Sequence, residues 1–156
     1  MDRREMLGIL GAGAAGLAAL SAQADEKSAD HCCELDQVHA DCLKACSDCA
    51  KACDMTFHHC YMQVAEGKKE HAKSLHLSSD CAGFCSLSAC MIAKHSPLMM
   101  YSCEACAEAC RTTAAEVGKF DSHEMQDTVR KLRECERSCR AMVADMRAKA
   151  GGLKAN

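Results

Sequence analysis

The chain has 156 residues, a length suited to a single domain. Its formal net charge of −3 is small, so charge alone indicates neither a nucleic-acid-binding protein nor one attracted to membrane surfaces. Aromatic residues make up only 3% of the sequence and Trp is absent, whereas Cys occurs 15 times and Met 10 times. This composition excludes a conventional aromatic core and leaves sulfur side chains to fill one.

Residues 1–24 have the pattern of an export signal. Arg3-Arg4 precedes a weakly apolar, glycine-containing run at 8–20, and Ala22-Gln23-Ala24 matches an A-x-A cleavage site. The apolar run is too short to cross a bilayer. We therefore predict a twin-arginine-like signal and a periplasmic location, with no membrane anchor after cleavage.

A first long helix is predicted over residues 31–66, with Asp30 as its N-cap and Gly67 near its C-terminus. From Cys42 to Cys60 the cysteines follow one another at steps of four, three, four and seven residues. These steps keep side chains on one helix face, at heptad a and d positions. Charged residues such as Asp36 and Lys44 fall on the outer, solvated face. The predicted inward row is Cys32, Leu35, His39, Cys42, Cys46, Cys49, Cys53, Thr56, Cys60 and Gln63.

Three further helices are predicted over 69–95, over 97–117 and from the residue after Asp121 or Ser122 to about Lys149, with residues 153–156 as a frayed tail. Pro97 is placed in the first turn of the third helix. The connections are short, which favours an antiparallel neighbour at each turn. The predicted fold is therefore all-α: an antiparallel up-down four-helix bundle over residues 25–152 with a cysteine-lined core.

Each later helix also carries sulfur residues in its inward row. These are Cys81 and Cys85; Met99, Cys103, Cys106 and Cys110; and Cys135, Cys139, Met142 and Met146. Folding the sequence about its turns brings all four cysteine groups to one level of the bundle. His39, Met99, Met142 and Met146 gather near the end that holds both termini. Cys90 is off the row, because nine residues at about 100° each place it opposite Cys81. It is either at a flank or an inert buried thiol.

Thiolate and thioether ligands favour Cu(I), an ion that accepts two or three sulfur atoms with little geometric demand. Cysteines four residues apart on a helix place their Cβ atoms about 5–6 Å apart, so two sulfurs can reach one ion. The pairs of this kind are Cys42/Cys46, Cys49/Cys53, Cys81/Cys85, Cys106/Cys110 and Cys135/Cys139. Facing rows of such pairs predict a site for multiple Cu(I) ions.

Other roles for the cysteines remain as alternatives. Structural zinc needs four ligands, usually carried on loops, and 15 cysteines on helices exceed that need. An iron–sulfur cluster matches Cys42-x3-Cys46-x2-Cys49 in spacing, but helical periodicity alone generates that spacing. A disulfide-held structural or interaction bundle is the remaining alternative, although neighbours on one helix are poorly oriented to pair.

The sequence does not indicate an enzyme. It shows no set of nucleophile, base and orienting group, no paired carboxylates and no phosphate-binding loop. A thiol oxidoreductase would need a low-pKa cysteine at a helix N-terminus, and the Cys-x2-Cys pairs here lie within helices.

The segments CLKACSDCAKAC, DCAGFC, CEACAEAC and CERSC resemble those of the bacterial copper storage proteins. The resemblance covers most of residues 32–146. It implies a four-helix bundle whose inward cysteines bind many Cu(I) ions, for copper storage or detoxification, with His and Met ligands at an open end where copper enters. It also implies that the bundle can form homo-oligomers. Cys90 and the adjacent Cys32 and Cys33 depart from the pattern. The predicted metal ligands are Cys32, Cys42, Cys46, Cys49, Cys53, Cys60, Cys81, Cys85, Cys90, Cys103, Cys106, Cys110, Cys135, Cys139, His39, Met99, Met142 and Met146.

Overall fold

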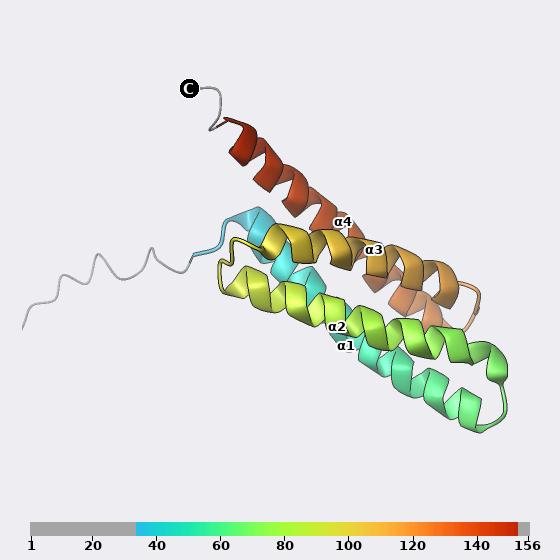
Figure 1. Cartoon of the computed structure of the whole chain (residues 1–156). Coiled ribbons are helices and arrows are strands. Elements are labelled where there is room, and N and C mark those ends of the chain that lie inside the picture. The colour runs from blue at the N-terminus through green and yellow to red at the C-terminus, as the bar shows by residue number, and fades with distance from the viewer. Residues whose placement is uncertain (1–33, 153–156) are drawn as a thin grey trace, which may run out of the picture. The chain divides into compact units, whose positions relative to one another are not determined.

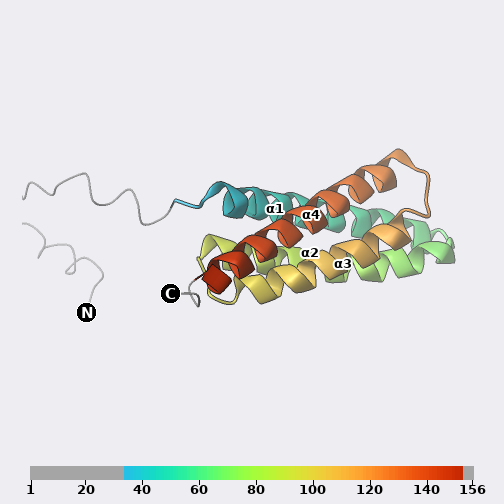
Figure 2. The ribbon, with the colours of Figure 1, turned by 90° about the horizontal axis from the view of Figure 1, so that it is seen from above.

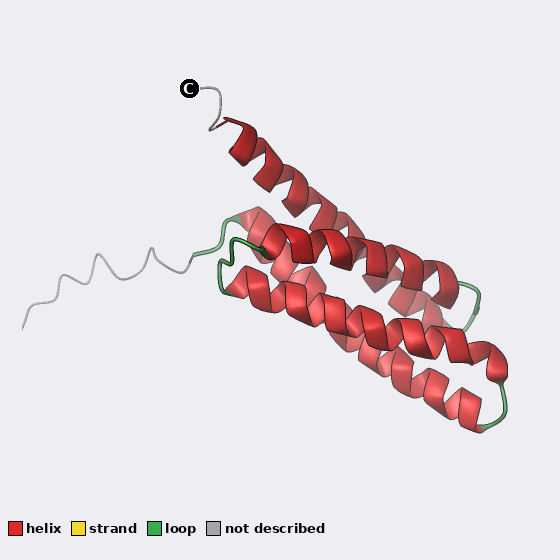
Figure 3. Ribbon diagram, viewed as in Figure 1, coloured by secondary structure: helices red, strands yellow, loops and turns green. Residues whose placement is uncertain are grey.

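The computed structural model describes residues 34–152 of the chain, and the side chains of residues 34–150. The expected export signal at 1–24, Cys32, Cys33 and the tail at 153–156 lie outside the described residues. The described part consists of α1 (Gln37–Ala65), a short 3-10 helix η2 (Lys69–His71), α2 (Ala72–Ala93), α3 (Met99–Val117) and α4 (His123–Gly152). The all-α prediction is confirmed (Figures 1 and 3).

The start of α1 differs from the prediction. Residues 34–36 are not helical, and the side chain of Asp36 caps the helix by accepting a hydrogen bond from the backbone N–H of His39 at 3.0 Å. Asp36 was expected on the solvated face within a helix that began at residue 31. An aspartate at this position stabilises the first turn because it satisfies a backbone donor that the helix leaves unpaired.

The connections at the two ends of α2 use residues with positive φ. Gly67 (φ 89°) follows the end of α1, which agrees with its predicted position near the C-terminus of the first helix. His95 (φ 49°) follows the end of α2. The third helix begins at Met99, so the placement of Pro97 in its first turn is wrong. Instead, Ser96 accepts a hydrogen bond from the backbone of Leu98 and holds residues 96–98 in a turn.

The fourth helix begins where it was expected and continues to Gly152, beyond the predicted end near Lys149. Glycine favours helix ends but is free to adopt helical angles, so it does not force an end. Helix α1 packs against α2 and α4, and α3 packs against the same two helices. Consecutive helices run antiparallel, which gives the predicted up-down bundle (Figure 2). Among the described helices, none is long and apolar enough to cross a membrane.

The interior contains few large aliphatic side chains. Ile92, Leu132 and Met142 are fully buried, while alanines such as Ala107 and Ala114 line the helix contacts. Small side chains let neighbouring helices approach closely, and most of the other residues in the core cluster are cysteines. Free cysteine behaves as a small hydrophobe, so this core contributes less hydrophobic burial than a Leu- and Ile-rich one.

Candidate metal centre

The four helices direct a continuous set of thiols into the bundle interior. We call this set the thiol core. Every member has 0% of its surface exposed. Its members are Cys42, Cys46, Cys49 and Cys53 of α1, Cys81 and Cys85 of α2, Cys103, Cys106 and Cys110 of α3, and Cys135 and Cys139 of α4. The prediction that these residues occupy inward positions at one level of the bundle is confirmed.

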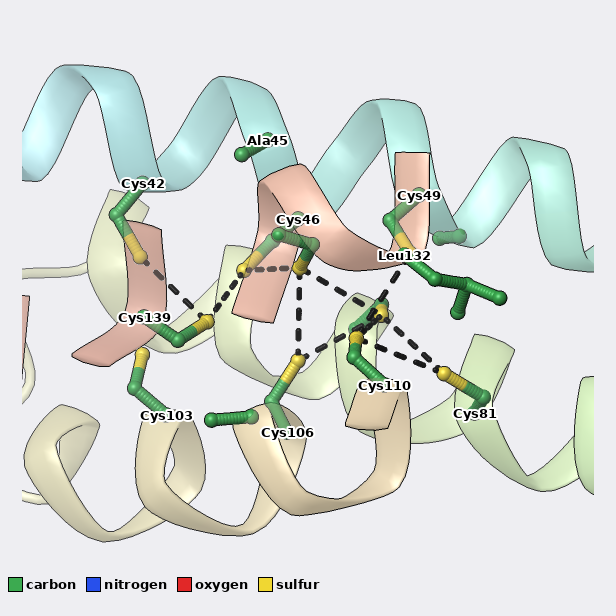
Figure 4. Packing of buried hydrophobic residues seen from close by; sticks show 14 of the residues in the cluster. Cys42, Ala45, Cys46, Cys49, Cys81, Cys103, Cys106, Cys110, Leu132 and Cys139 are labelled. Carbon is green, nitrogen blue, oxygen red and sulfur yellow. Dashed lines mark hydrogen bonds between the residues drawn. The ribbon is translucent and has the colours of Figure 1, made fainter. Parts of the chain in front are cut away.

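The closest sulfur contacts mostly join different helices (Figure 4). Cys46 and Cys42 of α1 both approach Cys139 of α4, at 3.5 and 3.7 Å. Cys106 of α3 lies 3.5 Å from Cys85 of α2. Within a single helix, the sulfurs of Cys81 and Cys85 are 3.9 Å apart. A Cys-x3-Cys pair is therefore one part of a network rather than a self-contained site.

The thiol core divides into overlapping groups in which all sulfurs lie within 4.8 Å of one another. Cys135 belongs to two groups of four, and Cys49 and Cys139 are likewise each shared by two groups. The groups are Cys46/Cys106/Cys135/Cys139, Cys49/Cys85/Cys110/Cys135, Cys42/Cys103/Cys139 and Cys49/Cys53/Cys81. Shared sulfurs suit thiolates that bridge adjacent ions. They do not suit two separate, closed tetrahedral zinc sites, each of which needs four ligands of its own.

The cysteines that the structure describes are all free. Their closest sulfur atoms lie 3.5 Å apart, as in the Cys106–Cys85 pair, whereas a disulfide bond is about 2.05 Å long. The sulfur atoms in the described interior are therefore not bonded to one another and can each bind a metal ion.

Hydrogen bonding among the thiols sets their protonation. Interaction with Cys106 and the other neighbouring thiols, together with burial, raises the pKa of Cys85 well above its ordinary range. Hydrogen bonding with Cys103 and other thiols, with burial, does the same to the pKa of Cys46. Hydrogen bonding with Cys110 instead lowers the pKa of Cys81 to about 5. The metal-free core therefore holds protons that a metal ion would displace.

One end of the thiol core carries His39, Met99, Met142 and Met146, and we call it the gate end. Met142 is fully buried within the core cluster, and Met99 and Met146 pack against it while remaining partly exposed. The His39 side chain is 12% exposed. At the gate end, partly exposed side chains therefore lie next to the fully buried sulfur of Met142.

Asp36 fixes the ring of His39 at the gate end. Its Oδ1 lies 2.6 Å from Nδ1 of His39, and its Oδ2 accepts a hydrogen bond from Lys149 at 3.0 Å. The side-chain and backbone hydrogen bonds of His39, followed by that of Lys149, hold the pKa of Asp36 well below its usual range. Asp145 joins Asp36 and His39 in a group of potential ligand atoms. The sequence analysis did not associate these residues, although Asp36 lies one helical turn before His39.

The remaining predicted ligands lie elsewhere. Cys60 is fully buried but belongs to a separate cluster with Val117 and Met125. Cys90 is exposed on α2, so it is not a buried thiol, and it belongs to none of the thiol groups. Cys32 falls outside the described residues. The ligand roles of these three cysteines stay predictions.

A buried histidine, His71, lies beside Cys60. Its Nδ1 is 3.9 Å from the Cys60 sulfur. Burial, followed by the charge of His59, lowers the pKa of His71, while burial raises that of Cys60. The helical spacing carried no signal for this contact, because His71 lies on the short η2 segment outside the regular helical rows.

Comparison with known proteins agrees with the geometry. The sequence model of the copper storage protein family matches residues 35–144. The Cu(I)-bound copper storage protein BsCsp3 superposes with a TM-score of 0.64 and 30% identity, covering 69% of this chain and 99% of that one. The metal-free copper storage protein 3 from Bacillus subtilis gives a TM-score of 0.60 and 30% identity, covering 67% and 97%.

A protein from Nitrosospira multiformis also superposes, with a TM-score of 0.62 and 31% identity over 70% of this chain and 98% of that one. No match was found among curated protein sequences. The family match extends over most of the bundle, including the whole thiol core. This chain therefore belongs to the copper storage protein family.

Proposed function

We propose that this protein stores many Cu(I) ions in its thiol core. The observation that carries the proposal is the set of overlapping thiol groups, in which single sulfurs such as that of Cys135 are shared between neighbouring groups. Thiolates select Cu(I) and can bridge two ions, so a continuous set of buried sulfurs holds a polynuclear cluster. The similarity to the Cu(I)-bound BsCsp3 supports the same cargo.

Loading exchanges protons for copper. Each Cu(I) ion that binds a protonated thiol displaces one proton, so the net charge of the buried core stays nearly constant as ions accumulate. Low net charge matters here, because an uncompensated ion in a dry interior is costly. The thiols whose pKa is raised, such as Cys85 and Cys46, supply these protons at neutral pH.

The gate end is where copper enters in this proposal. Met146 and Met99 remain partly exposed and pack against the core, and Met142 lies fully buried behind them. Thioethers bind Cu(I) weakly and without displacing protons, so they can pass an ion inward to thiolates. His39, with its ring held by Asp36, offers an imidazole at the same end.

Storage, rather than catalysis, is the role we assign to the centre. The ligand atoms are fully enclosed, and such enclosure suits retention of ions more than turnover of a substrate. We further propose that residues 1–24 direct export to the periplasm by the twin-arginine route. That route carries folded proteins, so copper could be loaded before export. Homo-oligomerisation of the bundle stays a prediction.

Anaerobic titration with Cu(I) in the presence of a chromophoric chelator tests the proposal. We expect each chain to bind many Cu(I) ions before the chelator begins to bind the added copper. Saturation at one or two ions per chain would overturn the storage function. Thiol titration of the metal-free protein excludes the disulfide alternative if nearly all cysteines react after unfolding, and supports that alternative if few do.

A further inference from the structure

The end of the bundle opposite the gate holds a second buried cluster, which we call the far-end cluster. Cys60, Val117 and Met125 form it, with Leu75, Phe120 and Val129 packed against it. Cys60 has 0% of its surface exposed and is a member of none of the overlapping thiol groups. Its nearby polar group is an imidazole, that of His71.

His71 is held in one orientation by its neighbours. Its side chain is buried, with 8% of the residue exposed, and its ring stacks on Phe120 with centroids 4.1 Å apart and an interplanar angle of 21°. His59 contacts the same ring edge-on, at a centroid separation of 5.9 Å. Stacking fixes the ring plane, and in this plane Nδ1 lies 3.9 Å from the sulfur of Cys60.

That separation suits two ligands of one metal ion. With metal–sulfur and metal–nitrogen bonds of about 2.3 and 2.0 Å, atoms 3.9 Å apart subtend an angle of roughly 130° at the ion. Such an angle is wider than tetrahedral and close to trigonal. Cu(I) accepts two or three ligands, whereas structural zinc requires four.

Met125 carries a thioether group in the same cluster. Its side chain is only 1% exposed and packs with Cys60. Thiolate, imidazole and thioether together form a soft ligand set of the kind that favours Cu(I) over Zn²⁺. We propose that Cys60, His71 and Met125 form a second copper centre, which binds a single Cu(I) ion apart from the thiol core.

A layer of hydroxyl groups separates this centre from the thiol core. Thr56 and Thr128 are both buried, and their hydroxyl oxygens lie 2.8 Å apart across α1 and α4. Thr56 falls between Cys53 and Cys60 in the inward row of α1. Hydroxyl oxygens are hard ligands and do not bridge Cu(I) ions, so the copper–thiolate network cannot extend through this layer. The far-end centre is for this reason mononuclear.

A pocket gives a route from solvent to the far-end cluster. It has a volume of about 410 Å³ and lies between α1 and α4. Met125 lines this pocket and also packs with Cys60, so the pocket reaches the layer of side chains next to the thiol. Several other lining residues carry imidazole or thioether groups, namely Met55, His58, His59, Met62 and His123.

The test compares anaerobic Cu(I) capacity of the full chain with that of three variants. Cys60→Ser removes the thiolate, and His71→Phe keeps an aromatic ring on Phe120 while removing the ligand nitrogen. We expect each variant to bind one ion fewer per chain than the unsubstituted protein. The combined variant should also lose only one ion, because both residues hold the same ion. His76→Ala, which changes an exposed residue on α2, serves as the matched control and should keep full capacity.

A spectroscopic measurement makes the result independent of folding defects. In ¹⁵N-histidine-labelled protein, the Nδ1 resonance of His71 should shift as copper fills the chain, and the shift should be absent in Cys60→Ser. Unchanged capacity in both single variants, a loss of two ions in the combined variant, or a constant His71 resonance would each overturn the proposal.

The inference rests on the proposed function only in taking Cu(I) as the bound ion. Different results would contradict the storage function and the far-end copper centre. If storage fails, the unsubstituted chain saturates at one or two ions. If only the far-end centre fails, the chain still binds many ions, and its capacity does not respond to Cys60→Ser or His71→Phe.

Discussion

The sulfur atoms of Cys46 and Cys139 lie 3.5 Å apart, although 93 positions separate these residues in the chain. Cys46 comes from the first helix of the bundle and Cys139 from the last. Cys42 reaches the same Cys139 sulfur at 3.7 Å. Contacts of this kind, between helices distant in sequence, turn separate rows of cysteines into one cluster. They also indicate which substitutions will affect the most copper sites.

Replacing Cys139 with Ser should lower copper capacity by at least about one ion per chain, since two thiol groups share this residue. A serine hydroxyl is too hard a ligand to substitute for the thiolate. Capacity is measured by anaerobic titration, and helix content by circular dichroism, which should not change. His76→Ala, at an exposed position on α2, is the matched control and should bind as many ions as the unsubstituted chain. Equal capacity in the two variants would exclude Cys139 as a ligand.

Copper should stabilise the fold strongly, because metal–sulfur bonds link all four helices in the folded state only. The metal-free protein depends on few large side chains, and Leu132 is one of them. Leu132→Ala should cost about 2–5 kcal/mol of unfolding free energy in the metal-free form. Urea unfolding followed by circular dichroism measures this value.

The control for Leu132 is Leu98→Ala, since Leu98 is 55% exposed in the turn before α3. This change should alter the unfolding free energy by no more than about 0.5 kcal/mol. Adding Cu(I) should raise the unfolding temperature of both variants. A copper-independent unfolding temperature would contradict cross-linking of the helices by metal.

Copper retention should weaken as pH falls. The raised pKa values of Cys85 and Cys46 mean that protons are bound tightly to these thiols in the metal-free core and must be displaced by copper. Lower pH increases proton competition, so less copper is held at equilibrium. Transfer to a chelator of known pH dependence, followed from about pH 8 to about pH 5, measures the effect. Retention that does not fall across this range, or that rises toward acid, would show that binding does not displace thiol protons.

Changes at the gate end should slow copper uptake without altering capacity. His39→Ala and Met146→Leu remove ligand atoms that precede the thiol core, whereas the thiols that hold most of the ions remain in place. Stopped-flow transfer of Cu(I) from a chelator should be severalfold slower in each variant. His76→Ala, on the exposed face of α2, should load at the original rate. Equal loading rates in all three variants would place the entry route elsewhere, for example at the far-end pocket.

Local sequence signals predicted the helices well and their ends less well. The four-three spacing of the cysteines from Cys42 to Cys53 identifies a buried helical face, because only a helix brings such positions together. The same periodicity cannot fix where the helix begins. Asp36 fits equally well as a solvated residue within α1 or as its N-cap, and the structure selects the cap through the backbone N–H of His39. Pro97 is similarly compatible with a first helical turn and with the turn that precedes α3.

The sequence by itself determined the fold class and the chemistry of the core, since helical spacing and thiol content are properties of single segments. It also predicted the level at which the cysteine groups meet, because short turns between helices leave little freedom in their alignment. It pointed to pairs within one helix as the sites, and it carried no sign of the contact between Cys60 and His71.

Only the tertiary structure decided which sulfurs are neighbours. The rotation of each helix about its axis and the approach of helices across Ala107 and Ala114 set distances such as that between Cys85 and Cys106. Packing also separated Cys60 from the other thiols with a layer that contains Thr56 and Thr128. Distances across helices depend on the whole packed interior, so no local pattern in the chain can specify them.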